Sequence, residues 1–135
     1  MMFQTKSRPI HPALRSSILN EINAENVYII CGYTDMRRSI DGLAATVKQV
    51  FKLDPCSYSL FMFCGRKSDR IKALLWEGDG FLLLYKRLEN GGRFQWPRKE
   101  PEVRSLTPQQ LRWLLEGLSL NQPGALRSIG SVVVV

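Results

Sequence analysis

The chain has 135 residues, of which 44% are hydrophobic, and its 19 Lys and Arg exceed its 12 Asp and Glu, for a formal net charge of +7. This length and composition suit one domain with a real core and exclude a wholly disordered protein. The chain has no apolar run of roughly 18 to 20 residues, which a membrane-spanning helix needs, and its first residues lack the apolar segment of a secretory signal.

The first half of the chain predicts an extension, a strand and a helix. Residues 1–26 are interpreted as an N-terminal extension, with at most a short helix near Pro12. The β-branched run at 27–31 predicts a buried strand that ends at a glycine. Apolar residues at helical spacing predict an amphipathic helix over 36–52.

The second half predicts several strands followed by a second helix. The strands are expected at 60–64, 70–77, 81–88 and 93–96, with glycine-containing turns between them. A capping box from Thr107 to Gln110, with Pro108 at the first helical position, then predicts a helix start. Its apolar stripe consists of Leu111, Leu114, Leu115 and Leu118.

This order of elements predicts the fold class. It indicates a single α+β domain over residues 27–120, in which two main helices pack on an antiparallel, meander-like sheet. Residues 121–135 are expected to form a C-terminal tail, and the four valines at its end could add an edge strand. We expect a cytoplasmic protein without a membrane partner.

Three cysteines and one histidine offer few metal ligands. Cys31, Cys56 and Cys64 include no C-x-x-C pair, and the histidine is His11 in the extension. A structural zinc site would need nearly all of these side chains. Because free cysteine usually packs as a small apolar residue, we predict buried, reduced thiols. No metal site and no cofactor are expected.

A basic region spans residues 66–99, which carry nine Lys and Arg against four acids. Such an excess favours a polyanionic partner, although it could also serve solubility alone. Cations on a sheet can bind phosphates, and exposed aromatic rings can stack on unpaired bases. Phe81 and Phe94 suit the core better, and Trp76 suits either role. The candidate nucleic-acid-binding residues are Arg37, Arg38, Arg66, Lys72, Trp76, Lys86, Arg87, Arg93 and Trp96.

Catalytic chemistry has little support in the sequence. A nuclease with two metal ions could use Asp35 or Asp41 with Glu77 or Asp79, but helix caps, ion pairs and turns explain these acids as well. The stretch 65–68 follows a strand as a phosphate-binding loop does, but it lacks the required glycine spacing. We therefore predict that the protein is not an enzyme and has no catalytic residues.

Several short motifs, taken in series, resemble a known family. They are GYTDMRR at 32–38, DGLA at 41–44, KALLWE at 72–77, KRLE at 86–89, FQWP at 94–97 and LTPQQL at 106–111. In this order, over about residues 27–120, they resemble the TnpB-type, Orf2-like accessory protein of the IS66 family of bacterial insertion sequences. The resemblance implies a cytoplasmic role in DNA transposition beside a separate transposase, and it supplies no catalytic residues.

Two functions are consistent with these features. The first is a non-catalytic accessory factor that contacts DNA, expected to be the insertion-sequence ends, through its basic hairpins. The second is an interaction module that binds the partner transposase without direct DNA contact, so that its positive charge meets an acidic protein surface. The exposure of Trp76, Tyr85 and Trp96 should distinguish the two.

Overall fold

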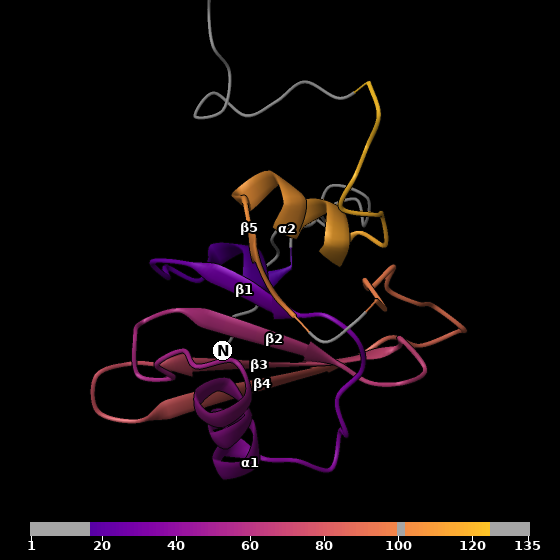
Figure 1. The fold of residues 1–135 in the computed structure, drawn as a ribbon. Coiled ribbons are helices and arrows are strands. Elements are labelled where there is room, and N and C mark those ends of the chain that lie inside the picture. Colours follow the sequence, from indigo (N-terminus) through magenta and orange to yellow (C-terminus); the bar gives the residue numbers. More distant parts are fainter. Residues whose placement is uncertain (1–16, 100–101, 125–135) are drawn as a thin grey trace, which may run out of the picture.

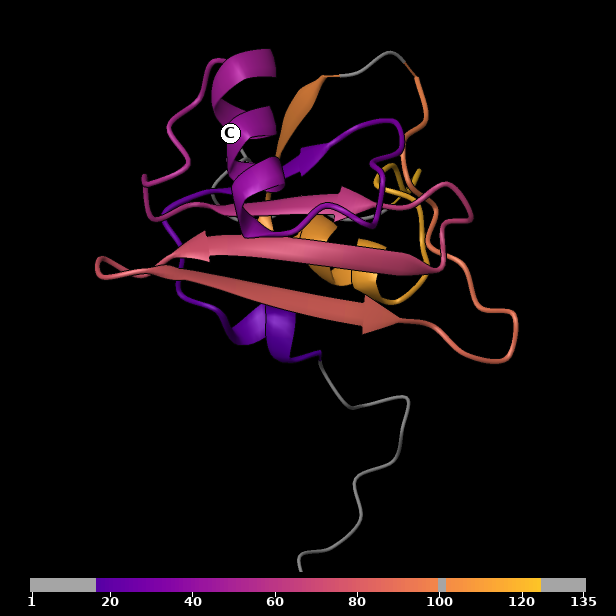
Figure 2. The same cartoon turned by 90° about the horizontal axis from the view of Figure 1, so that it is seen from below.

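The computed structural model describes residues 17–99 and 102–124, which form a five-stranded sheet with helices on both faces (Figures 1 and 2). β1 pairs with β2 in parallel, and the other neighbouring strands are antiparallel. The predicted α+β class is confirmed, but the sheet is mixed, and only β2, β3 and β4 form the predicted meander. The strand order is β4 (Phe81–Arg87), β3 (Arg70–Trp76), β2 (Leu60–Cys64), β1 (Val27–Ile30) and β5 (Val103–Leu106).

The parallel pair is connected by a helical crossover on one face of the sheet. It consists of α1 (Ile40–Ala45) and the π-helix η3 (Thr46–Val50), within the predicted range of 36–52. The helix begins later than predicted because Ser39 is its N-cap and the chain turns before it. Leu43 and Val47 are fully buried against the sheet, as their helical spacing predicts.

The second helix covers the opposite face. In α2 (Pro108–Leu115) the predicted capping box is present, with Thr107 Oγ1 accepting from the Gln110 N–H at 3.1 Å. The three leucines within the helix are buried, whereas Leu118 lies beyond its end and is 39% exposed. The 3-10 helix η2 (Ile18–Glu21) contributes Leu19 to the same core. Packing therefore begins inside the predicted N-terminal extension.

The predicted strand at 93–96 does not form. Phe94 and Trp96 are both buried, and the Trp96 indole N–H donates to the carbonyl oxygen of Ile30 at 2.9 Å. The segment thus enters the core through its aromatic side chains and pairs with no strand. The last strand within the described residues is β5, which lies in a stretch predicted as loop and pairs antiparallel with β1.

Two of the three cysteines are buried as predicted. Burial raises the pKa of the Cys64 thiol to about 11, and Cys31 is also buried. The prediction was wrong for Cys56, which is exposed in a turn where its N–H donates to Asp54 at 2.9 Å. The predicted helix near Pro12 and the terminal valines lie outside the described residues.

The buried face of the crossover helix supports a first prediction. Leu43→Ala should lower the free energy of unfolding by about 2 to 5 kcal/mol, because it leaves a cavity beneath the helix. Val50→Ala, at a position 61% exposed in the same crossover, should change it by less than about 0.5 kcal/mol. Urea denaturation followed by circular dichroism measures both, and equal midpoints for the two variants would contradict this packing.

Candidate nucleic-acid interface

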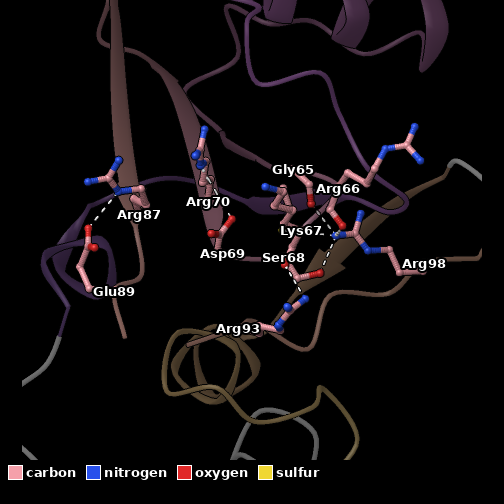
Figure 3. Close-up of polar contacts among 11 residues, drawn as sticks. Gly65, Arg66, Lys67, Ser68, Asp69, Arg70, Arg87, Glu89, Arg93 and Arg98 are labelled. Atoms are coloured by element: carbon pink, nitrogen blue, oxygen red, sulfur yellow. Dashed lines mark hydrogen bonds and ion pairs between the residues drawn. The ribbon is translucent and has the colours of Figure 1, made fainter. Parts of the chain in front are cut away.

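The turn between β2 and β3 is the centre of a cationic surface, shown in Figure 3. We call residues 65–69 the basic turn. It carries Arg66 and Lys67, and Arg70 follows it at the start of β3. In the β3–β4 ladder Arg87 pairs with Arg70, so it also lies at this end of the sheet. Arg93 and Arg98 reach the turn from the segment that follows β4.

Backbone and arginine hydrogen bonds hold the basic turn in place. The Ser68 N–H donates to the Gly65 carbonyl oxygen at 3.0 Å, and Ser68 has a left-handed φ of 61°. Arg98 Nη2 donates to the Gly65 carbonyl oxygen at 2.5 Å and to Ser68 Oγ at 2.6 Å. Arg93 Nη1 donates to the Lys67 carbonyl oxygen at 3.2 Å. Two arginines are therefore fixed by neutral acceptors and keep their full charge.

Carboxylates offset only part of this charge. Arg87 pairs with Glu89 at 2.9 Å, and Arg70 lies 3.8 Å from Asp69. Within the described parts of the chain, no carboxylate lies within 4 Å of the charged groups of Arg66, Lys67, Arg93 or Arg98. Six Lys and Arg side chains thus stand against two carboxylates, so the surface keeps a net positive charge.

The loop at 33–38 extends the cationic surface beside the basic turn. Arg66 Nη2 donates to the Tyr33 hydroxyl at 2.6 Å, and the Arg66 guanidinium lies 4.1 Å from the centre of the Tyr33 ring. Lys72 Nζ donates to the Arg38 carbonyl oxygen at 2.6 Å. Arg37 forms hydrogen bonds with Asp35 that hold the pKa of that carboxyl well below its usual range.

Two adjoining hollows lie between this loop, the basic turn and the sheet. The first has a volume of about 400 Å³ and lies between Tyr33 and the basic turn. The second, of about 480 Å³, reaches Lys72, Leu83 and Tyr85. We call the two together the tyrosine groove, because one exposed tyrosine lies at each end. The residues that line both hollows are Asp35, Met36, Arg37 and Arg70.

The structure brings most of the predicted cations together. The loop at 33–38 and the basic turn line the same hollow, and Lys72 contacts this loop. Arg87 and Arg93 lie beside the basic turn. These five predicted residues are Arg37, Arg66, Lys72, Arg87 and Arg93. The Arg38 side chain instead turns toward the crossover helix, where its Nη1 donates to Thr46 Oγ1 at 2.7 Å.

Three further predicted residues lie elsewhere. Lys86 pairs with the buried Ile71 and faces the side of the sheet that carries η2. Trp76 is at the far end of β3, six residues from Arg70 and so about 20 Å away, where it packs against Phe81. Trp96 is only 5% exposed, so its predicted stacking on a base is excluded by its place in the core.

Sequence reasoning did not select four residues of this surface. Lys67, Arg70 and Arg98 counted toward the basic region but had no signal that set them apart. Tyr33 lies within the GYTDMRR motif, and that position next to two arginines was the available signal. Arg98 could not be assigned, because its role depends on a chain reversal after β4 that brings it to Ser68.

The acidic residues do not form a candidate metal centre. The described residues contain no group of three or more His, Cys, Asp and Glu side chains placed to hold a metal ion. Asp35 is engaged by Arg37 near the start of β3, whereas Glu77 and Asp79 follow its far end. Asp35 therefore does not lie beside Glu77 or Asp79, as a nuclease site built from these acids would need.

Comparisons with known proteins give one matching family model and similar bacterial proteins. The family model described as "IS66 Orf2 like protein" matches residues 25–125. The "Uncharacterized protein y4hO" of Sinorhizobium fredii is 40% identical over 97 residues, which cover 72% of this chain and 84% of that protein. The "Uncharacterized protein y4jC" of the same organism is 32% identical over 84 residues, covering 62% of this chain and 71% of that protein. No solved structure matches the chain significantly.

The buried indole supports a second prediction. Trp96→Phe removes the hydrogen bond to the Ile30 carbonyl oxygen and should lower the free energy of unfolding by about 1 to 3 kcal/mol. Trp76→Phe is the matched control, because that indole donates no hydrogen bond within the described residues. Urea denaturation compares the two variants. If Trp96→Phe lowered the free energy of unfolding no more than Trp76→Phe does, the hydrogen bond of the Trp96 indole would not stabilise the fold.

Proposed function

The chain belongs to the IS66 Orf2 like protein family, and we propose that it acts in transposition as an accessory factor whose basic turn contacts DNA phosphates. The DNA would be the ends of the insertion sequence, in the bacterial cytoplasm. The separate transposase of the same element is the expected protein partner.

The observation that carries the proposal is the clustering of cations around one fixed turn. Arg93 and Arg98 bind backbone carbonyl oxygens there, so their charged groups are held in place before any ligand arrives. Arg66 and Lys67 project from the same turn (Figure 3). Phosphate binding to such a preformed array loses little side-chain entropy and releases counterions from the DNA.

The proposed role is non-catalytic and does not involve a membrane. Of the acids considered for a metal site, Asp35 is ion-paired with Arg37, and Glu77 and Asp79 follow the far end of β3. This separation supports binding over hydrolysis. None of the helices in the described residues combines the length and the apolar character needed to cross a membrane.

A salt titration tests the DNA contact. If the basic turn neutralises about four phosphates of a duplex, the logarithm of the association constant should fall with the logarithm of salt concentration at a slope of roughly −3 to −4. The double variant Arg66→Ala, Lys67→Ala removes two cations that have no carboxylate partner in the described parts of the chain. It should weaken binding to all sequences alike and reduce the slope by about 2, because phosphate contacts carry no base information.

The chain offers a control of equal charge for this experiment. Lys86→Ala with Arg112→Ala removes two cations from the opposite side of the sheet, at η2 and α2. This control should keep nearly all of the binding and most of the slope, as measured by fluorescence anisotropy. If the wild type shows no salt-sensitive binding even at low ionic strength, the proposed contact between the basic turn and DNA is wrong. The cationic surface would then be assigned to an acidic face of the transposase.

A cleavage assay tests the non-catalytic part of the proposal. The purified protein should leave supercoiled DNA intact in the presence of magnesium or manganese ions, because the acids of residues 17–99 and 102–124 form no group that could hold a metal ion. Agarose gels of DNA incubated with and without a chelator provide the measurement. Nicking that disappears in Asp35→Ala or Asp79→Ala would show that the protein is an enzyme.

A further inference from the structure

We propose that the tyrosine groove binds single-stranded DNA, with a base stacked on the tyrosine at each end and the backbone held by the cations between them. The inference rests on the proposed function, because it specifies which form of DNA the surface accepts. It also adds contacts that the basic turn alone does not provide.

Tyr33 forms one end of the groove. The residue is 55% exposed even with the Arg66 guanidinium 4.1 Å from the centre of its ring. The hydrogen bond from Arg66 to the Tyr33 hydroxyl fixes the direction in which this ring points. A large aromatic side chain that is held in place but left exposed has the properties of a stacking platform for a base.

Tyr85 forms the other end and repeats the same arrangement. It lies on β4, opposite Lys72 in the ladder, so both side chains project from the face that carries α1. The residue is 52% exposed, and Lys72 Nζ lies 5.8 Å from the centre of its ring. Both ends of the groove thus combine an exposed ring with a cation, and cations also strengthen the binding of nucleic acids to aromatic platforms.

The interior of the groove suits unpaired nucleotides. Met36 and Leu83 provide apolar surface for the faces of bases, and Arg37 and Arg70 provide charge for phosphates. The groove also contains carboxylates, but Asp35 is bound by Arg37 at 2.7 Å and Asp69 lies 3.8 Å from Arg70. A carboxylate that is paired with an arginine repels a nearby phosphate less than a free carboxylate would.

The geometry separates single strands from duplex DNA. In a duplex the bases are stacked on each other, so their faces are not available to Tyr33 or Tyr85. Phosphates remain available in both forms, and the basic turn can therefore bind either one. Only an unpaired strand can use the cations and the two rings together.

Fluorescence anisotropy at low salt, with an oligothymidine of about 15 nucleotides and a duplex of the same length, tests the inference. Tyr33→Ala and Tyr85→Ala should each weaken oligothymidine binding by roughly 5- to 100-fold, and change duplex binding by less than about twofold. Tyr33→Phe keeps the ring and should retain most of the single-strand affinity.

Two further variants serve as controls for this experiment. Tyr58→Ala removes a tyrosine that is 49% exposed and lies beside Gly78 at the β3–β4 hairpin, away from the groove. This variant should bind both probes like the wild type. Tyr85→Leu keeps an apolar side chain suited to β4 without an aromatic ring. If circular dichroism shows that Tyr85→Ala is unfolded, Tyr85→Leu tests the same contact with a base.

Selective loss of oligothymidine binding in the variants without a ring at Tyr33 or Tyr85 would support the inference. If these variants bind both probes like the wild type, the groove does not stack bases, while the phosphate contacts of the proposed function remain. If the wild type binds neither probe in a salt-sensitive way, the proposed function fails and the inference fails with it.

Discussion

The hydrogen bond from the buried Trp96 indole to the carbonyl oxygen of Ile30 fixes the segment on which the cationic surface depends. Next to it, the Gly32 N–H donates to the Pro97 carbonyl oxygen at 2.8 Å, so the segment is attached to the end of β1 at two points. These bonds place Arg98 where it can bind Gly65 and Ser68. The position of the basic turn is therefore set by the core as well as by its own backbone.

The acceptors that the arginine side chains bind explain how several positive charges can lie close together on this surface. An arginine that binds a carbonyl oxygen is oriented without being neutralised, whereas a carboxylate would both orient it and cancel its charge. Arg93 and Arg98 follow the first pattern, and Arg37 and Arg87 follow the second. Mutual repulsion among the unneutralised cations disfavours the folded state, and a bound polyanion would relieve it. Stability and anion binding are thus coupled in this surface.

The sequence predicted the elements whose signals are local. Helical spacing identified Leu43 and Val47 as buried, and the capping box at Thr107 identified the start of α2. The strands β1 to β4 were all predicted, β1 and β2 from their apolar runs. The mixed sheet was not predicted, because the pairing of β1 with β2 and β5 depends on contacts between distant parts of the chain.

The same distinction applies to the candidate site. The clustering of Arg66 with Arg93 follows from the order of strands and turns, so the basic character of this region was predictable. The face of each side chain was harder to predict: Lys86 and Arg87 are neighbours in sequence, yet strand alternation sends them to opposite sides of the sheet. Trp96 was selected as a stacking residue because its burial depends on Ile30, which lies 66 positions earlier in the chain.

The place of β1 in the sheet also governs how the chain can fold during its synthesis. β1 is made early, but one of its neighbours, β5, includes Leu106, which pairs with Val27. Until the ribosome has released that stretch, the β5 side of β1 has unpaired backbone groups, which are open to pairing with other chains. The nascent domain must therefore wait for nearly its whole length before the sheet is closed on this side. Such distant pairing is typical of slow folding, so the newly made protein passes through a period in which it is prone to aggregate.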